Sequence, residues 1–432
     1  MSGGEIVSGL ALPGVRPRPR ATLGERLRAL TAEQVAIGAT AVAVAGLPLL
    51  VPAGPANIAP ADLLIGVAIV AATVWGWRTR QVWRFPYLVA IAVFVLGGAL
   101  GAVAGPVPGT GAVALVQDIV LLLACWSVAN VCSTPERLQI VLAAWAYSAF
   151  AWASVLVVGI VVGSPTLKGE TARDGARTTL TLHDPNYAAS YFFVGLMIVW
   201  AAGRPRGLRA RLAATAALVV ALVSTGSNSG VVSLIVGAAV AFLVFLYRQR
   251  GPASALAALV CLVAVGYVAG SNVSITGIQN WAQDSKYAFL RDGIGRGDSS
   301  ITERSTILHE SLPLYRSGGF FGQGPASTKA RLAAEQAPYV KEAHDDYVAT
   351  LLERGAIGVL GLILLVGSVL QRAWSGSARR LHARVAAVVP HPSALAGAVA
   401  GTLAGAAFNE LLHTRHVWAL FAVVAAVGLS RE

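Results

Sequence analysis

Long runs of apolar residues, separated by short polar segments, organise most of this chain. Most runs are close to the length of about 17–25 residues that a helix needs to cross a bilayer. The pattern predicts an all-α integral membrane protein with about twelve transmembrane helices. The seventh run is short and the tenth contains Glu353 and Arg354, so these two fit the pattern least well. The predicted spans are 35–53, 59–77, 86–104, 112–131, 138–163, 185–202, 211–225, 229–247, 253–271, 345–370, 393–409 and 413–430.

The positions of the arginines orient these spans. Cytoplasmic connections of membrane proteins carry an excess of Lys and Arg. Arginines occur before the first run and after the even-numbered runs, whereas the connections near 54–58, 105–111 and 226–228 contain neither Lys nor Arg. Both termini are therefore expected in the cytoplasm. Two longer hydrophilic segments, 164–184 and 272–343, are expected on the outer side.

This layout divides the chain into four expected parts and points to the outer face as the place of function. Many transporters consist of repeated halves, but we find no internal repeat, and the large hydrophilic segment is off-centre. We expect it to be a mostly helical outer loop. The parts are a basic cytoplasmic segment (1–34), helices one to nine (35–271), the large outer loop (272–343) and helices ten to twelve (344–432).

Composition excludes several other classes of protein. Only 12% of residues are charged, against about 25% in an average soluble domain. The net charge of +12 comes from arginines scattered between apolar runs, so we expect no nucleic-acid partner. The chain has no P-loop, no dinucleotide-binding fingerprint and no zinc-ligand spacing. We therefore expect no cofactor and no metal.

Candidate functional residues gather around the large outer loop. Arg291 and Arg304 lie within it, and His344 and Tyr347 open the tenth span on one helix face. Arginine is permanently charged and its fork matches phosphate oxygens. Histidine can take a proton from a hydroxyl near neutral pH. These residues favour transfer from a lipid pyrophosphate at the membrane surface.

Further candidates belong to the smaller outer segment and its neighbours. Arg177 lies in this segment, and Asn186 stands at the mouth of the sixth span. Asp118 lies just below the outer surface in the fourth span, where a carboxylate is costly unless it faces protein or water. Asp118 therefore either bonds a neighbouring helix or lines a cavity.

Four short motifs, in order and spacing, resemble the bacterial O-antigen ligase and O-antigen polymerase superfamily, which is related to the GT-C glycosyltransferases. The resemblance covers about 110–410, and Asp184–Tyr187 also matches a family element that precedes a span. The four motifs are Glu303-Arg304, Gly322-Gln323-Gly324, His344-Asp345-Asp346-Tyr347 and Gly355-Ala356-Ile357-Gly358.

The resemblance implies roles for individual residues. Arg304 matches an arginine that binds donor phosphate, and His344 matches a histidine that activates the acceptor hydroxyl or assists at the pyrophosphate. Arg177 matches a basic residue upstream of the Pro-Asn element. One departure concerns Asn228, because the family often has an arginine there, in Gly-Ser-Arg-Ser-Gly. Either another arginine (173, 177 or 291) supplies that charge, or the donor is held differently, or this protein has another substrate.

The resemblance implies a metal-independent, inverting glycosyltransferase at the outer face of the cytoplasmic membrane. Its expected donor is a polyprenyl-pyrophosphate-linked saccharide, and its acceptor a glycan or glycolipid. Three alternatives stay open: a glycan polymerase of the same superfamily, a transporter or flippase of lipid-linked saccharides, and a scaffold without catalysis. A transporter would not need a large outer loop, and it would place charges near the bilayer centre, where this chain has almost none.

Overall fold

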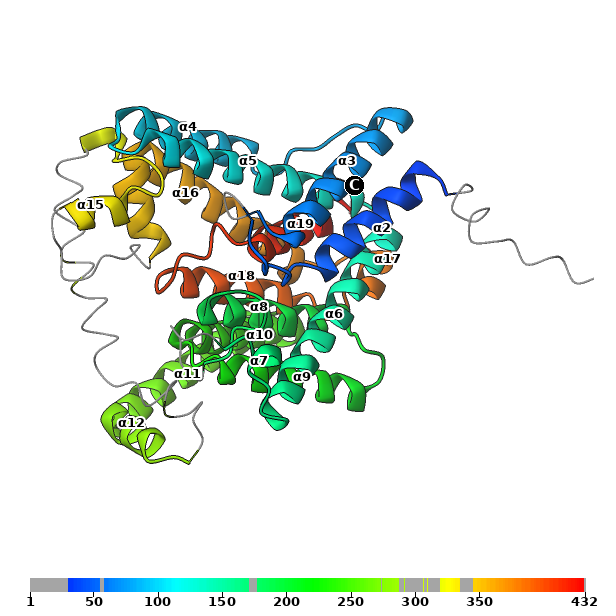
Figure 1. Cartoon of the computed structure of the whole chain (residues 1–432). Coiled ribbons are helices and arrows are strands. Elements are labelled where there is room, and N and C mark those ends of the chain that lie inside the picture. The colour runs from blue at the N-terminus through cyan, green and yellow to red at the C-terminus, as the bar shows by residue number, and fades with distance from the viewer. Residues whose placement is uncertain are drawn as a thin grey trace, which may run out of the picture.

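The computed structural model describes residues 30–54, 58–170, 177–272, 274–286, 319–334 and 345–430, together with Arg291, Thr306 and His309. Every regular element in these residues is a helix (Figure 1). The elements are α2 Ala32–Ala45, α3 Pro60–Thr79, α4 Leu88–Ala104, α5 Pro108–Val131, α6 Pro135–Val161, α7 Pro165–Lys168, α8 Pro185–Ala202, α9 Leu208–Ser224, α10 Asn228–Arg250, α11 Pro252–Asn272, α12 Ile275–Gln283, η3 Gly319–Phe321, α15 Thr328–Ala334, α16 Asp346–Ala378, α17 Ala383–Val388, α18 Ser393–Ala406 and α19 Arg415–Leu429.

The main helices coincide with the apolar runs. In the described part of the chain, each of the twelve predicted spans overlaps one main helix. Seven of these, α3, α5, α6, α8, α10, α11 and α16, are long and apolar enough to cross a membrane. The apolar helices α2, α4, α18 and α19 are shorter. The chain is thus a multi-pass helical membrane protein, while the count of twelve spans and their orientation stay predictions.

The first predicted span, 35–53, is longer than the helix it contains. Helix α2 ends at Ala45, and Gly46 follows as its C-cap. Pro48 comes two residues later, and proline after a C-cap cannot continue a helix. The rest of the apolar run is therefore an irregular connection to α3.

Local sequence signals fix the helix starts that bear candidate residues. Asp184 caps α8 by accepting a hydrogen bond from the Asn186 N–H at 2.7 Å. Asp345 caps α16 in the same way, from the Tyr347 N–H at 2.8 Å. Ser227 caps α10 by accepting a hydrogen bond from the Gly230 N–H at 3.2 Å.

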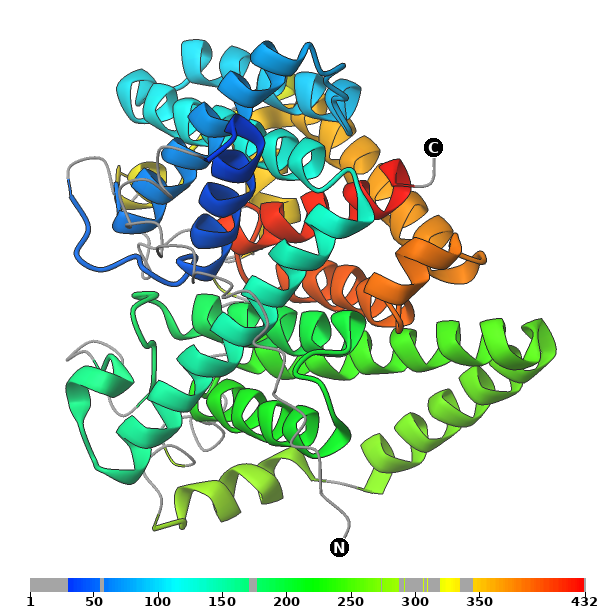
Figure 2. The ribbon, with the colours of Figure 1, turned by 90° about the vertical axis from the view of Figure 1, so that its right-hand side faces the viewer.

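The helices form two packed groups with α18 and α19 between them. In Figure 1, α4, α5 and α16 lie together on one side of α18 and α19, and α6, α8, α9 and α10 lie on the other. Helix α8 is buried over most of its length, and its Tyr191, Phe192 and Phe193 are fully buried. Helix α11 contacts α10 and leads away from the bundle to α12 (Figure 2).

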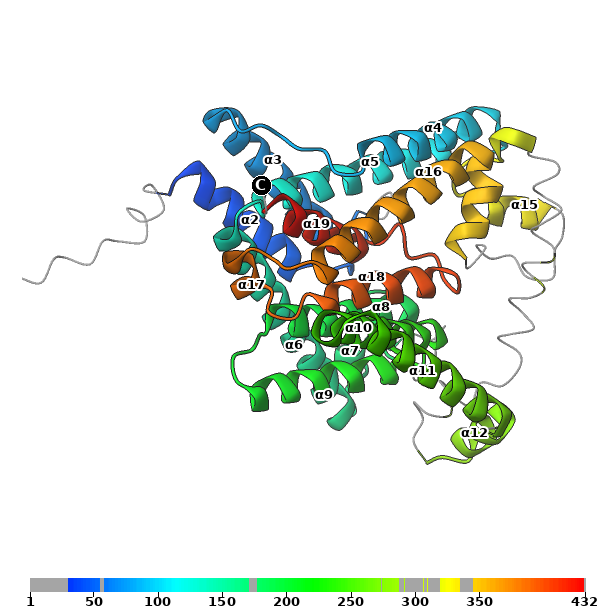
Figure 3. The same cartoon turned by 180° about the vertical axis from the view of Figure 1, so that it is seen from behind.

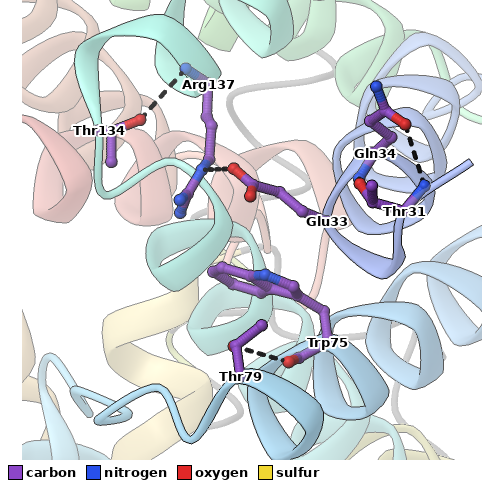
Figure 4. Close-up of polar contacts among 7 residues, drawn as sticks. All are labelled: Thr31, Glu33, Gln34, Trp75, Thr79, Thr134 and Arg137. Atoms are coloured by element: carbon purple, nitrogen blue, oxygen red, sulfur yellow. Dashed lines mark hydrogen bonds and ion pairs between the residues drawn. The ribbon is translucent and has the colours of Figure 1, made fainter.

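One end of the bundle carries an ion pair that joins three helices (Figure 4). The Arg137 guanidinium, at the start of α6, donates to the Glu33 carboxylate at the start of α2 at 2.8 Å. It also lies 4.7 Å from the ring centroid of Trp75, near the end of α3. Two helix starts and one helix end therefore lie together, so α3 runs opposite to α2 and α6.

Helix α16 is broken near its start. Gly355 has φ 60° and ψ −162°, which is not helical, and the helix continues in a new direction beyond it. Figure 3 shows the two stretches, with the shorter one beside α15 and the longer one running along the bundle. The break lies where α16 packs most closely on α4, through Gly97, Gly358 and Gly361.

Candidate functional site

The two residues expected to be catalytic, Arg304 and His344, lie outside the described residues. Arg291 is described and exposed, and its guanidinium donates to the Ser285 carbonyl at 3.4 Å, beyond the end of α12. This contact ties Arg291 to its own neighbourhood in the sequence.

Arg177 lies against the turn that joins α9 to α10. Its side chain is buried, and its Nε donates a hydrogen bond to the Thr225 carbonyl at 2.8 Å. The next residue, Thr178, shares a hydroxyl–hydroxyl hydrogen bond of 2.9 Å with Ser224. This part of the smaller outer segment is therefore fixed to the end of α9, and it brings a guanidinium to the turn.

Ser227 connects the same turn to the start of α8. Its Oγ donates to the Asn186 side-chain oxygen at 2.7 Å and lies 2.9 Å from Ser229 Oγ. The Gly230 N–H donates to Ser227 Oγ at 3.2 Å. Asn228, between these two serines, is exposed.

Three sequence-predicted candidates, Arg177, Asn186 and Asn228, thus meet around the turn at 225–230. This turn ends in the N-terminus of α10, where unpaired N–H groups and the helix dipole favour negative charge. Together with a guanidinium, this arrangement suits an anionic group such as a phosphate.

The first turn of α8 also takes part in a second polar contact, through Tyr187. Tyr187 Oη lies 2.8 Å from Nε2 of His413, which belongs to the connection between α18 and α19. Beside them, the Arg415 guanidinium donates to both oxygens of Asp62, at 2.6 and 2.5 Å. The sequence interpretation gave His413 no function, and nothing in its local pattern predicts Tyr187 as a partner.

The start of α16 is held by its own carboxylates. Asp346 Oδ2 is buried and accepts hydrogen bonds from the N–H groups of Leu411 and Leu412, at 2.6 and 3.0 Å. Asp345 Oδ1 accepts hydrogen bonds from the N–H groups of Tyr347 and Val348, at 2.8 and 3.1 Å. Tyr347 Oη donates to the Leu403 carbonyl at 2.8 Å, so this candidate ties α16 to α18.

Asp118 forms an ion pair across two helices. Arg354 Nη2 donates to Asp118 Oδ2 at 2.7 Å, and the guanidinium lies 4.1 Å from the ring centroid of Phe94. Both charged side chains are mostly buried. Of the two alternatives left open by the sequence, the structure gives Asp118 a helix–helix contact. Arg354 was visible as a charge in an apolar run, but the sequence did not identify its partner.

The glycine turn of the large loop, Gly322-Gln323-Gly324, lies against the break in α16. The N–H groups of Gln323 and Gly324 donate to the carbonyls of Leu352 and Glu353, at 2.8 and 2.9 Å. Gly322, at φ 81°, has no room for a side chain, because a Cβ there would lie 2.5 Å from the Gly355 nitrogen. The two glycine motifs, separate in sequence, therefore form one contact.

Part of the chain matches a known protein family. Residues 213–363 match the family described as O-antigen ligase. This segment begins in α9 and ends in α16 just beyond the break, so it includes Asn228 and Glu353 as well as both expected catalytic residues. No curated protein matches the chain. The match supports assignment to the O-antigen ligase superfamily and covers about a third of the 432 residues.

Proposed function

We propose that this multi-pass membrane protein, which contains an O-antigen ligase domain, transfers a saccharide from a polyprenyl-pyrophosphate donor to a glycan or glycolipid acceptor. The reaction takes place at the outer face of the cytoplasmic membrane. The family match supports the class of reaction. The observation that carries the site is the meeting of Arg177, Asn186 and Asn228 around the turn at 225–230.

The pyrophosphate of the donor binds at this turn. Arg177 supplies positive charge there, which addresses the asparagine at position 228, where the family often has an arginine. The Arg177 guanidinium is bonded through Nε to Thr225, so its position relative to the start of α10 is fixed. Arg304 from the large outer loop adds a second positive charge, and Asn228 adds a neutral hydrogen-bonding group.

The transfer is a single displacement. The acceptor hydroxyl oxygen attacks the anomeric carbon, and the bond from this carbon to the pyrophosphate oxygen breaks. The electron pair leaves with the polyprenyl pyrophosphate, and His344 takes the proton of the attacking hydroxyl. One displacement inverts the anomeric centre. The arginines stabilise charge that develops on the leaving group, so the step needs no metal.

The function is tested in a deletion strain complemented with wild type, Arg304→Ala or His344→Ala, at equal amounts of membrane protein. Loss of one envelope glycan, with accumulation of its lipid-linked precursor at the outer face, supports transfer. Accumulation at the inner face instead favours a flippase. Retention of single units without long chains favours a polymerase, and a normal envelope in both variants contradicts the proposal.

Arg177→Ala is expected to lower transfer about tenfold or more, because charge-assisted hydrogen bonds contribute ~1.5–3 kcal/mol. Arg177→Lys keeps the charge without the fork and should be intermediate. Asn228→Arg should restore part of the transfer in the Arg177→Ala background. The measurement is the rate of glycan formation in membranes from an excess of lipid-linked donor.

The matched control for this series is Arg209→Ala, at the opposite, exposed end of α9. It should leave transfer unchanged. Equal rates in wild type and Arg177→Ala, or no gain from Asn228→Arg, would argue that the donor charge is neutralised elsewhere.

A further inference from the structure

We infer that Glu353 is a positioning residue, which anchors the loop segment 319–334 to the break in α16 and so fixes one end of the connection that carries His344. The anchoring itself follows from contacts of described residues. Its effect on catalysis rests on the proposed function. The sequence pattern marks Glu353 only as a charge that fits poorly in the tenth span.

The break in α16 creates acceptors for this anchor. A helix carbonyl normally accepts a hydrogen bond from the N–H four residues later. At Gly355 the backbone leaves the helical conformation, and the carbonyls of Leu352 and Glu353 accept from Gln323 and Gly324 instead. The loop backbone therefore satisfies polar groups that the break would otherwise leave unpaired.

The Glu353 carboxylate adds three hydrogen bonds to the same segment. One oxygen accepts from the Ala326 N–H at 2.8 Å. The other accepts from Thr328 twice, from its hydroxyl at 2.7 Å and its N–H at 3.3 Å. Thr328 is the first residue of α15, so Glu353 holds this helix at its start.

An apolar contact completes the anchor. Leu332 of α15 and Leu352 of α16 are both almost completely buried and pack together with Val348. Glu353 and Leu352 are neighbours on α16, so polar and apolar contacts hold α15 on the same stretch of this helix. The segment is thus fixed to the turn of α16 that precedes the break.

Positions 335–344, which include His344, are flanked on both sides by described residues that these contacts hold. Their preceding residue belongs to α15, which Glu353 holds. Their following residue, Asp345, caps α16, whose start is tied to the α18–α19 connection by Asp346. Loss of the Glu353 anchor releases one of the two ends. We expect slower chemistry without weaker donor binding, because the anchored segment 319–334 contains neither Arg177 nor Arg304, the two residues that hold the donor in the proposed function.

The anchoring is tested by trypsin cleavage of the full-length protein in detergent micelles. Lys329 and Arg331 lie in the anchored segment, and wild type should be cut slowly there. Glu353→Ala should be cut at least tenfold faster at these sites, and Glu353→Gln at an intermediate rate. The control is Glu33→Ala, which removes a glutamate from an ion pair elsewhere in the bundle. Equal cleavage of wild type and Glu353→Ala would overturn the anchoring.

The catalytic consequence is tested with two milder substitutions at Thr328, the hydrogen-bond partner of Glu353. Thr328→Val removes the hydroxyl at similar size, and Thr328→Ser keeps it. We expect Thr328→Val to lower kcat at least threefold, with the donor KM within twofold of wild type, and Thr328→Ser to retain most of kcat. In the Glu353→Ala background the Thr328→Val effect should vanish, because the two groups act as one unit.

The outcomes separate this inference from the proposed function. If Glu353→Ala speeds cleavage but leaves kcat unchanged, Glu353 anchors the segment without positioning the catalytic group, and the inference fails. If donor KM rises together with the fall in kcat, the contact belongs to donor binding, and the inference also fails. If wild type transfers no saccharide, the proposed function fails, whereas the cleavage rates still decide whether Glu353 anchors the loop.

Discussion

Gly355→Ala should unfold the outer end of α16 and abolish transfer. The backbone of Gly355 has a positive φ with extended ψ, a region that is essentially restricted to glycine. A Cβ at this position would overlap the Phe320 carbonyl oxygen of the docked loop. Backbone strain and steric overlap together should lower the free energy of unfolding by about 3 kcal/mol or more. The midpoint of thermal unfolding in detergent and the rate of glycan transfer would both report the loss.

The same helix offers a matched control for this substitution. Gly367 is also in α16, and a Cβ there would meet no heavy atom within 4 Å. Gly367→Ala should be neutral or stabilise the protein by up to ~1 kcal/mol, because alanine has the higher helix propensity. If Gly355→Ala behaves like Gly367→Ala, α16 is continuous in the working protein and the break is not required.

Removal of one partner of the Asp118–Arg354 pair is expected to have the second largest effect. A charge that loses its partner in buried, apolar surroundings lowers the free energy of unfolding by about 3–5 kcal/mol. Asp118→Leu would leave the Arg354 guanidinium unpaired beside Phe94, and Arg354→Met would leave the carboxylate unpaired. Both single variants should lower the unfolding midpoint and the amount of protein in the membrane.

The double variant Asp118→Leu/Arg354→Met should recover most of that stability, because replacing both charges removes the cost of burying them. The Glu33–Arg137 pair serves as the comparison, since Glu33 is 45% exposed. Glu33→Ala should cost no more than about 1 kcal/mol. A double variant as unstable as the two single variants combined would show that the pair does not act as a unit.

The sequence predicted the helices well, because the bilayer imposes length and apolarity on every span. Each main helix that the structure describes coincides with an apolar run of the sequence. The prediction was less accurate where backbone chemistry ends or breaks a helix within an apolar run, as at Gly46 and Gly355. Near Gly355 the sequence indicated only the two charges of the tenth run, Glu353 and Arg354, and the break itself was not predicted.

The candidate site was predictable by residue type and only partly by contact. Arg177, Asn186 and Asn228 were identified from the resemblance, and the structure brings their segments together through Thr225 and Ser227. The contacts of Glu353 and His413 were not predicted, because their partners lie far away in the sequence. The pairing of helix ends depends on tertiary packing, which no local pattern encodes.

The close packing of α16 on α4 has a consequence for exchanging parts between related proteins. The segment that matches the family ends in α16, but the surface that receives α16 belongs to α4, which lies outside that segment. Backbone meets backbone there without side chains between, at Gly97 and Gly358 and at Gly361 and Phe94. Residues 213–363 are therefore not an independent module. A chimera that imports this segment from a relative should work only when it imports the matching α4 as well.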